Sequence, residues 1–405
     1  MLGTIYTGLS GLNAYSRGLE VISNNVANLN TPGFKVSLPV FREIMYQQLR
    51  TPSGNGAGLR PGGAGVALNS SAMSFRAGDL RNTGNALDVA IDGRGFFVLD
   101  DQDGNRVYTR AGQLTFDRDG VLVDSVTGAR VVVSTDALAQ TSFDLDSVRV
   151  FDPRATSEVT LTGSLARASG SVNSHELPNV TLFDAAGTSL TVRVKLTRNG
   201  DDPLRWAVEI LKTDNTQIGQ GEITFSQNGT PAENANSITV TATAEGGQPF
   251  DVRFNFGAPG SFAGVTAPAA NNISTLQVLR QNGLAMGSLR TTEFTDNGQL
   301  KLTYSNGETR TVATLVLARF DSPEQLQVLG RGLFAATERT QPVMGAALTT
   351  GLGRVVGGQL ELSNVELTEQ FTDLIIMQRG YQACSQVNSV ANELILQLLQ
   401  MDRQG

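Results

Sequence analysis

The side chains that most often carry catalysis or bind metals are nearly absent from this chain. Histidine and cysteine occur once each, as His175 and Cys384. A structural zinc site needs about four Cys or His ligands, a disulfide needs a second Cys, and a Ser-His-Asp triad would depend on His175 alone. Because His175 stands in the polar stretch SVNSHELP, we interpret it as a surface histidine. The sequence therefore predicts no catalytic residue, no metal site and no cofactor-binding site.

Two further stretches share features with ligand-binding loops. Residues 54–65 are rich in glycine, but a phosphate-binding P-loop needs Gly-Lys-Ser/Thr at the start of a helix, and no lysine of this chain follows a glycine. The stretch DDQDGN at 100–105 is similar to a calcium loop, yet counting from Asp101 the twelfth position is Gly112 instead of the bidentate Glu. We interpret the first stretch as a linker and the second as a hairpin turn.

The charge balance excludes further classes of function. The chain carries 38 acidic and 31 basic residues, a net charge of -7, whereas a nucleic-acid-binding protein shows a clustered basic surface. No apolar run approaches the roughly 18 residues of a membrane span. The amino terminus, whose first basic residue is Arg17, lacks the charged start and apolar core of a secretory signal. We expect no nucleic-acid binding, no membrane insertion and no cleaved signal peptide.

A helix is predicted at the amino terminus, over residues 1–30. Its apolar residues recur at steps of three and four, and TPG at 31–33 ends it. Gly8, Gly11 and Gly18 lie inside it, each costing about 1 kcal/mol relative to Ala, and very few of its residues are charged. Such a helix is poorly suited to standing alone in water. Its predicted self-assembly seam consists of Leu9, Leu12, Leu19, Ile22, Val26 and Leu29.

A second helix is predicted from Ser363 to the end of the chain. Its apolar residues follow a period near 3.5, which is typical of a coiled-coil partner, and Ser363 with Glu366 matches a capping box at its start. We expect the two terminal helices to pair as a coiled coil. The predicted self-assembly seam of this helix consists of Phe371, Leu374, Tyr381, Cys384, Val387, Leu394 and Leu398.

The seam residues allow two interpretations. They form either an ordinary core within one chain or a surface that packs against other copies of the chain. The scarcity of charge on both helices favours the second, because polar but uncharged side chains avoid the desolvation cost of a buried charge. Cys384 falls on the seam without a basic neighbour that would form a thiolate. We therefore expect it to be a packing residue.

Between the helices the pattern changes to short strands separated by turns. Asn-Gly and Asp-Gly pairs between apolar or alternating stretches signal β-hairpins, and composition shifts at 51–65 and 257–272 mark connectors. The predicted fold class is a multidomain protein with a mainly β body, an inserted all-β domain and long terminal helices. The predicted domains are an N-terminal helix at 1–30, an extended linker at 31–75, a discontinuous β domain at 76–145 and 287–357, an inserted outer β domain at 146–286, and a linker with the C-terminal helix at 358–405.

Short motifs stand near both ends of the chain. They are GLSGLNA at 8–14, VISNNVAN at 21–28, GFK at 33–35, AIDGRGFF at 90–97, YTRAG at 108–112, LELSNVELTEQF at 360–371 and QRGYQA at 378–383. Together and in this order, they resemble the signatures of bacterial flagellar rod and hook proteins. The family-motif residues are Asn24, Asn25, Asn28, Gly33, Phe34, Lys35, Gly93, Gly95, Phe96, Phe97, Ser363, Asn364, Gln378, Arg379, Tyr381 and Gln382.

The resemblance implies a function outside enzymology. Within the family, the length of the chain and its large middle insertion favour the hook subunits; the alternative is a shorter distal rod subunit or another axial protein of the hook-basal body. The resemblance implies a subunit that polymerises into a curved hollow helical tube, a flexible universal joint that transmits torque from motor rod to filament in bacterial motility. It also implies an extracellular location in the hook, reached without a cleaved signal peptide.

The resemblance also implies partners. They are other copies of the chain, the rod, hook-cap and hook-filament junction proteins, and the flagellar type III export apparatus. A protein of another class, a secreted enzyme or a carbohydrate-binding β protein whose ends coil together, is the remaining interpretation. The single histidine and the lack of a convergent catalytic set argue against it.

Overall fold

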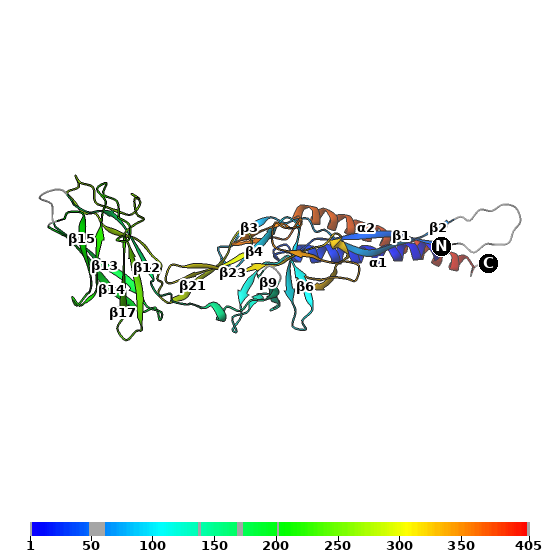
Figure 1. Cartoon of the computed structure of the whole chain (residues 1–405). Helices are drawn as coiled ribbons and strands as arrows, with labels where there is room; N and C mark the ends of the chain where they lie inside the picture. The colour runs from blue at the N-terminus through cyan, green and yellow to red at the C-terminus, as the bar shows by residue number, and fades with distance from the viewer. Residues whose placement is uncertain (1, 48–60, 137–138, 168–172, 201, 403–405) are drawn as a thin grey trace. The chain divides into compact units, whose positions relative to one another are not determined.

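A computed structural model of the chain describes residues 2–47, 61–136, 139–167, 173–200 and 202–402 (Figure 1). The chain divides into two compact units. The first comprises Met1–Asp146, Thr292–Leu302 and Arg310–Gly405, and the second comprises Ser147–Thr291 and Thr303–Thr309. The boundary between the units falls within three strands, β21 (Gly287–Phe294), β22 (Gln299–Tyr304) and β23 (Thr309–Leu315).

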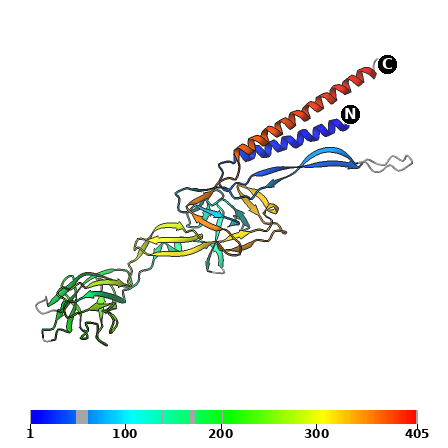
Figure 2. The ribbon, with the colours of Figure 1, turned by 90° about the horizontal axis from the view of Figure 1, so that it is seen from above.

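The first unit contains the long helices of the described chain, α1 (Leu2–Ala27) and α2 (Leu367–Asp402). They lie side by side and run in opposite directions, so that the two termini are at the same end of the pair (Figure 2). The prediction of a mainly β protein with an N-terminal and a C-terminal helix is confirmed.

Helix α1 ends at Ala27, three residues earlier than predicted. The side-chain amide of Asn28 turns back and donates to the carbonyl of Asn24 at 2.9 Å. The hydroxyl of Thr31 then donates to Asn28 Oδ1 at 3.0 Å. These side chains occupy the last turn and close it before the predicted stop at 31–33.

Helix α2 begins at Leu367, four residues later than predicted. Its first helical hydrogen bond runs from Gln370 N to Glu366 O at 3.0 Å. The predicted capping box is therefore wrong. Ser363 Oγ instead accepts a local hydrogen bond from Val365 N at 3.4 Å, in the non-helical segment before the helix.

Much of the predicted linker at 31–75 is a β-hairpin of β1 (Ser37–Gln47) and β2 (Pro61–Met73), paired antiparallel. The hairpin packs on α1, where Val66 N donates to Ser10 Oγ at 3.2 Å. A Cβ atom on Gly65 would lie 1.9 Å from the same hydroxyl. The expectation of an extended linker is thus corrected, because glycine here allows a strand to approach a helix closely. The part of the predicted connector at 51–60 lies outside the described residues.

The β body of the first unit is built from short strands. They are β3 (Leu80–Asn82), β4 (Val89–Asp92), β5 (Phe96–Asp100), β6 (Arg106–Thr109), β7 (Leu114–Phe116), β8 (Leu122–Asp124), β9 (Arg130–Asp136), β10 (Ala139–Ser142), β24 (Leu317–Arg319), β25 (Gln327–Gly330), β26 (Leu333–Ala335), β27 (Val343–Gly345), β28 (Arg354–Gly357) and β29 (Gln359–Glu361), with a 3-10 turn at Pro323–Gln325. The main sheet runs in the order β22-β23-β9-β5-β6-β26-β25, and β4 and β3 pair separately with β28 and β29. Its core includes the aromatic side chains of Phe96, Tyr108, Phe320 and Phe334.

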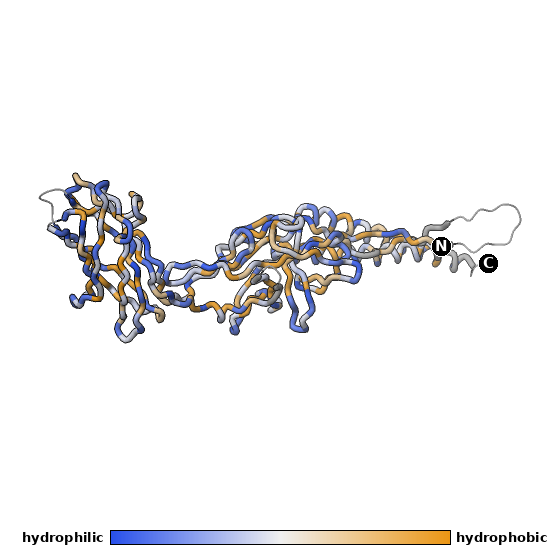
Figure 3. Tube along the Cα trace, viewed as in Figure 1, coloured by the Kyte–Doolittle hydropathy of each residue, from blue (hydrophilic) through white to orange (hydrophobic). Residues whose placement is uncertain are grey.

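The second unit is all-β. After a 3-10 turn at Asp146–Val148, its strands are β11 (Val150–Phe151), β12 (Glu158–Ser164), β13 (Ser174–Phe183), β14 (Ser189–Arg198), β15 (Arg205–Lys212), β16 (Gln217–Thr224), β17 (Ser237–Thr243), β18 (Pro249–Asn255), β19 (Val265–Thr266) and β20 (Gln277–Gln281). Two sheets, β13-β14-β15-β16 and β17-β18-β12-β19, contribute to one apolar core that includes Trp206. Figure 3 shows the apolar stretches along the strands and hydrophilic stretches in the turns.

The Asn-Gly and Asp-Gly turns are mostly where the sequence predicts them. Gly104, Gly298 and Gly307 have φ values of +80, +72 and +84° and close the hairpins β5-β6, β21-β22 and β22-β23. The pair Asp92-Gly93 forms no hairpin, because it joins β4 to β5 and these strands pair with different neighbours.

Candidate functional site: the helix pair and the buried ion-pair network at its base

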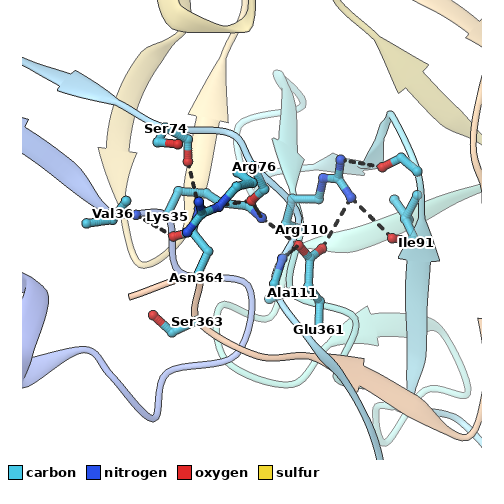
Figure 4. A network of polar contacts seen from close by, with 12 residues as sticks. Lys35, Val36, Ser74, Arg76, Ile91, Arg110, Ala111, Glu361, Ser363 and Asn364 are labelled. Atoms are coloured by element: carbon cyan, nitrogen blue, oxygen red, sulfur yellow. Dashed lines mark hydrogen bonds and ion pairs between the residues drawn. The ribbon is translucent and has the colours of Figure 1, made fainter. Parts of the chain in front are cut away.

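A buried carboxylate lies where the two helices meet the β body (Figure 4). Glu361 Oε1 accepts from Lys35 Nζ at 2.5 Å, and Oε2 accepts from Arg110 Nη1 at 3.2 Å. The backbone N–H of Gly78 donates to Oε1 at 2.9 Å. Lys35, Arg110 and Glu361 are 2%, 4% and 1% exposed. Three charges from the amino-terminal segment, the β body and the segment before α2 thus share one site.

Backbone carbonyls satisfy the remaining donors of the two cations. Lys35 Nζ donates to the carbonyl of Arg76 at 2.9 Å. Arg110 donates to the carbonyls of Ile91 and Gly93 at 3.3 and 2.8 Å, and its guanidinium lies 5.4 Å from the centre of the Phe96 ring. Buried charges are tolerated only when they are paired and hydrogen-bonded in this way.

The environment shifts the protonation equilibria of both cations. Burial lowers the pKa of Lys35, while the negative charge and hydrogen bond of Glu361 act in the opposite direction. Burial likewise lowers the pKa of Arg110, again opposed by Glu361. Each cation therefore depends on Glu361 to stay charged, and loss of that carboxylate would leave two buried positive charges unpaired.

Two asparagines extend the network to both helices. Asn364 Oδ1 accepts from Val36 N at 2.7 Å, and its amide donates to the carbonyls of Ser74 and Arg76, both at 2.9 Å. Asn25 Oδ1 accepts from Ser37 N at 3.0 Å. The amide of Asn25 donates to Ser37 O at 2.7 Å and to Gln370 Oε1 at 2.8 Å. Helix α1, helix α2 and strand β1 are therefore joined through fully buried amides.

Gly33 makes the turn that brings Lys35 into the site. Its φ of +71° is unfavourable for residues with a Cβ, and such an atom would lie 2.6 Å from Ala111 N. The Gly33 N–H donates to Glu361 O at 2.8 Å. Only glycine fits this position, which explains its place between α1 and Lys35.

The structure brings ten of the sixteen family-motif residues together. Those at or next to the network are Asn24, Asn25, Asn28, Gly33, Phe34, Lys35, Gly93, Phe96, Ser363 and Asn364. Gly95 has a φ of +141°, and the Phe97 side chain is fully buried in the β body. The remaining four lie on exposed positions of α2, away from the network: Gln378, Arg379, Tyr381 and Gln382.

Sequence reasoning did not single out Glu361, Arg110 and Gln370 as site residues, although all three complete the network. Glu361 and Arg110 lie inside the motif stretches 360–371 and 108–112. Glu361 stands between two leucines, and in a strand this alternation predicts a charge on the exposed face. The local pattern therefore does not reveal that Glu361 is buried and paired.

The predicted seam residues differ widely in exposure. Ile22 is buried, while Leu12, Leu19, Val26, Leu29, Leu374 and Cys384 are half-buried. The exposed ones are Leu9, Phe371, Tyr381, Val387 and Leu394. The side chain of Leu398 lies outside the described residues. The contact between α1 and α2 uses glycines on both helices, Gly8, Gly11 and Gly18 on α1 and Gly380 on α2, together with the hydrogen bond from Asn25 to Gln370. The predicted seam residue Cys384 takes part in it, because it lies against Gly11.

His175 lies on β13, opposite Leu196 of β14, and its side chain is partly exposed. Its position at the surface stays a prediction. Within the described residues, no three His, Cys, Asp or Glu side chains are grouped so as to hold a metal ion. No helix in the described part of the chain is long and apolar enough to cross a membrane.

Three family models match the chain in order. They are the flagella basal body rod protein model at residues 5–35, the flagellar hook protein FlgE/F/G D1 domain at 90–161, and the flagellar basal body rod FlgEFG protein C-terminal model at 356–401. The first and third cover most of α1 and α2 with Lys35, and the second covers Arg110. Each of the three models therefore includes one of the three charged residues of the buried network.

Relatives align with the chain from end to end. It is 29% identical to the flagellar hook protein FlgE of Escherichia coli (strain K12), over 97% of this chain and 98% of the relative. It is 28% identical to that of Treponema pallidum over all of both chains, and 27% identical to that of Borreliella burgdorferi over 99% and 100%. A crystal structure of Helicobacter pylori flagellar hook protein FlgE2 aligns with 69% of this chain and all of that chain at 13% identity, with a TM-score of 0.47.

Proposed function

We propose that this chain, which belongs to the flagellar rod and hook protein family, is a structural subunit of the bacterial flagellar hook and polymerises through its terminal helices. The relatives that align over its whole length are hook proteins, which favours the hook over the distal rod. The assembly mechanism is supported above all by the large apolar side chains that α1 and α2 leave exposed.

Large apolar side chains are exposed along both helices. They are Tyr6 and Leu9 on α1, and Leu367, Phe371, Ile375, Ile376, Tyr381, Val387, Val390, Leu394 and Leu396 on α2. A monomeric protein rarely exposes so many large apolar side chains on neighbouring helices, and such exposure marks a site of association. The five exposed seam residues Leu9, Phe371, Tyr381, Val387 and Leu394 belong to it, in line with packing between copies of the chain.

The exposed surface includes a groove that fits a further helix. Thr4 of α1 lines it on one side, and Ala383, Val387, Val390 and Leu394 of α2 line it on the other. Ridges of one helix pack into grooves of another at the spacing of such side chains. We infer that the occupant is a terminal helix of a second copy, and that α1 and α2 themselves wind as a coiled coil.

In a contact between unlike surfaces, each copy can bind the next one along. When the repeated rotation does not close into a ring, the copies form a helical tube. In this tube the helix pairs form the inner layer, and the second unit, proposed as the inserted outer β domain, lies outside. The buried network provides the torque path between layers within one subunit, because it joins α1, α2, β1 and the β body through charged and amide groups. Bending then occurs at the apolar and polar contacts between subunits.

The remaining inferences follow from the family. We infer a non-enzymatic role, export through the flagellar type III apparatus without a cleaved signal, and contacts with rod, hook-cap and hook-filament junction proteins. Each concerns the ends of the tube or its delivery. None is needed for the self-assembly of purified chain.

Electron microscopy of negatively stained, purified full-length chain tests the proposal. We expect concentration-dependent growth of curved tubes with an axial channel. Monodisperse chain at every concentration and salt condition that keeps it folded would contradict self-assembly. Straight tubes of uniform, short length would favour the distal rod.

A further inference from the structure

Glycines line the contact between α1 and α2. Each lies against one large side chain of the opposite helix, at the place that a Cβ atom would occupy: Gly8 against Asn388, Gly11 against Cys384, Gly18 against Met377, and Gly380 against Tyr15. The nearest approach of that Cβ position to the facing side chain is 2.4, 2.6, 3.1 and 2.5 Å. Each facing side chain therefore occupies space that a Cβ atom at the glycine would need, and it would have to shift to admit one.

These contacts define one register. In each facing pair, including the hydrogen-bonded pair Asn25 and Gln370, the two residue numbers sum to 395 or 396. A shift of one helical turn would place every large side chain against a different residue. Asn388 would then face Thr4 or Leu12, each of which has a Cβ where Gly8 has none.

Asn388 differs from the other side chains in the contact because burying its polar group costs free energy. Its Oδ1 is buried and accepts no hydrogen bond within the described chain. A buried acceptor without a donor costs roughly 1–3 kcal/mol, which an apolar side chain of similar shape avoids. Because this oxygen is unpaired where Asn388 faces Gly8, the size of the Asn388 side chain, and not its polarity, favours this register.

We propose that Asn388 is a positioning residue that, with Gly8, fixes the register of α2 against α1. The register decides which apolar side chains of the two helices share one exposed face, so it decides what a neighbouring subunit meets. The inference deepens the proposed function and rests on it for this consequence only. The register itself is a property of the single chain.

The native Cys384 offers a direct reporter. A Cβ on Gly11 would lie 3.6 Å from the Cβ of Cys384, and disulfides need a Cβ separation of about 3.5–4.5 Å. Gly11→Cys therefore reports the native register. Thr7→Cys, about one turn toward the amino terminus, reports the slipped register in which Asn388 would face Thr4.

Each variant is oxidised as dilute full-length chain, and the intramolecular cross-link is quantified by non-reducing electrophoresis and mass spectrometry. We expect efficient cross-linking of Gly11→Cys alone. Adding Asn388→Ala, which removes the side chain that fills the space beside Gly8, should raise the Thr7→Cys cross-link about tenfold, equivalent to about 1.4 kcal/mol of register preference. Asn392→Ala, the same truncation at an exposed position of α2, should leave the pattern unaltered.

Several outcomes would overturn the inference. They are a folded Gly11→Cys chain that does not cross-link, equal cross-linking of both reporters beside native Asn388, and an Asn388→Ala chain that still cross-links only through Gly11→Cys. Because the readout uses unassembled chain, it holds whether or not tubes form. Failure of every sample to form tubes would count against the proposed function and not against the register.

Discussion

Glu361 is the single carboxylate that compensates both buried cations, Lys35 and Arg110. Replacing it with a neutral isostere leaves two positive charges without a partner in a site that excludes water. We expect Glu361→Gln to destabilise the first unit by about 3–5 kcal/mol, the usual effect of removing one partner from a buried ion pair.

This loss is measured by hydrogen exchange in peptides covering 89–112, which belong to the first unit. Tryptophan fluorescence does not report on this unit, because the single Trp of the chain lies in the other one. Glu293→Gln is the matched control: Glu293 pairs with Lys301 at 3.0 Å, with side chains 46% and 37% exposed. Exposed pairs contribute about 0–1 kcal/mol. Equal protection in the two variants would show that the network does not hold the first unit together.

Tyr108 predicts how this unit responds to alkaline pH. Burial raises the pKa of its hydroxyl above the usual 10.0, Arg106 opposes the shift and Asp100 adds to it. The folded chain thus retains a proton that the unfolded chain releases. The stability contribution is complete below pH 10.0 and is lost as the pH rises through the raised pKa.

Tyr108→Phe removes this dependence while keeping the ring that contacts Phe320 at 4.8 Å. Urea unfolding followed by far-UV circular dichroism between about pH 9 and about pH 11 should show a shallower decline for the variant. Parallel curves for the two chains would mean that Tyr108 ionises in the folded state at its ordinary pKa.

At the scale of elements, the two helices serve two contacts at once. The glycine-lined face joins α1 to α2, while large apolar side chains elsewhere on both helices remain exposed. A search for apolar periods favours large side chains. It therefore found part of the exposed set and counted the glycines only as a loss of helix stability. The pairing face could not be predicted, because a glycine in a helix contact has no apolar signal of its own.

Leu394 tests the exposed face. It is 46% exposed in the groove of the helix pair, so Leu394→Asp should leave the stability of the single chain within about 0.5 kcal/mol. In an assembled tube the charge would be buried unpaired, at a cost of several kcal/mol. We expect tube formation to be abolished or shortened strongly.

Asn392→Asp is the control for the groove, since Asn392 is exposed on α2 and is not among the residues that line the groove with Leu394. Tube length by electron microscopy and monomer stability by circular dichroism are measured for both variants. Tubes of normal length with Leu394→Asp would place this residue in water and remove the groove from the assembly contact.

Local patterns were enough to place the terminal helices to within four residues and to predict many turns. Helix α1 ends at Ala27, shortly before the predicted stop at Thr31-Pro32-Gly33, and Asp103-Gly104 closes a hairpin through the positive φ of Gly104. The ion pair of Lys35 with Glu361 has no such signal, because the residues are 326 positions apart. Their encounter depends on the whole first unit being assembled.

At the scale of the whole molecule, the second unit has the properties of a removable insertion. Its two connections run side by side: Arg154 and Leu284 exchange backbone hydrogen bonds of 3.0 and 2.8 Å, and Val150 pairs with Ser288. The apolar core of the unit lies within residues 159–278. Residues 155–283 can thus be replaced by a short Gly linker without cutting that core.

We expect the excised piece, 155–283, to fold alone, with the fluorescence of buried Trp206 as readout. The shortened chain should still assemble, into a tube of changed curvature or stiffness, because the helix pair and the network are intact. An unfolded piece together with an unassembled remainder would show that the region belongs to one continuous domain.

The central claim is that the terminal helices drive self-assembly while the β units fold without them. The most direct test compares the full chain with one trimmed to residues 28–366, which keeps Glu361 and Asn364, by sedimentation velocity and electron microscopy under identical conditions. The account predicts tubes from the full chain and a folded monomer with β-type circular dichroism from the trimmed chain. Tubes from the trimmed chain, or a full chain that stays monomeric, would contradict it.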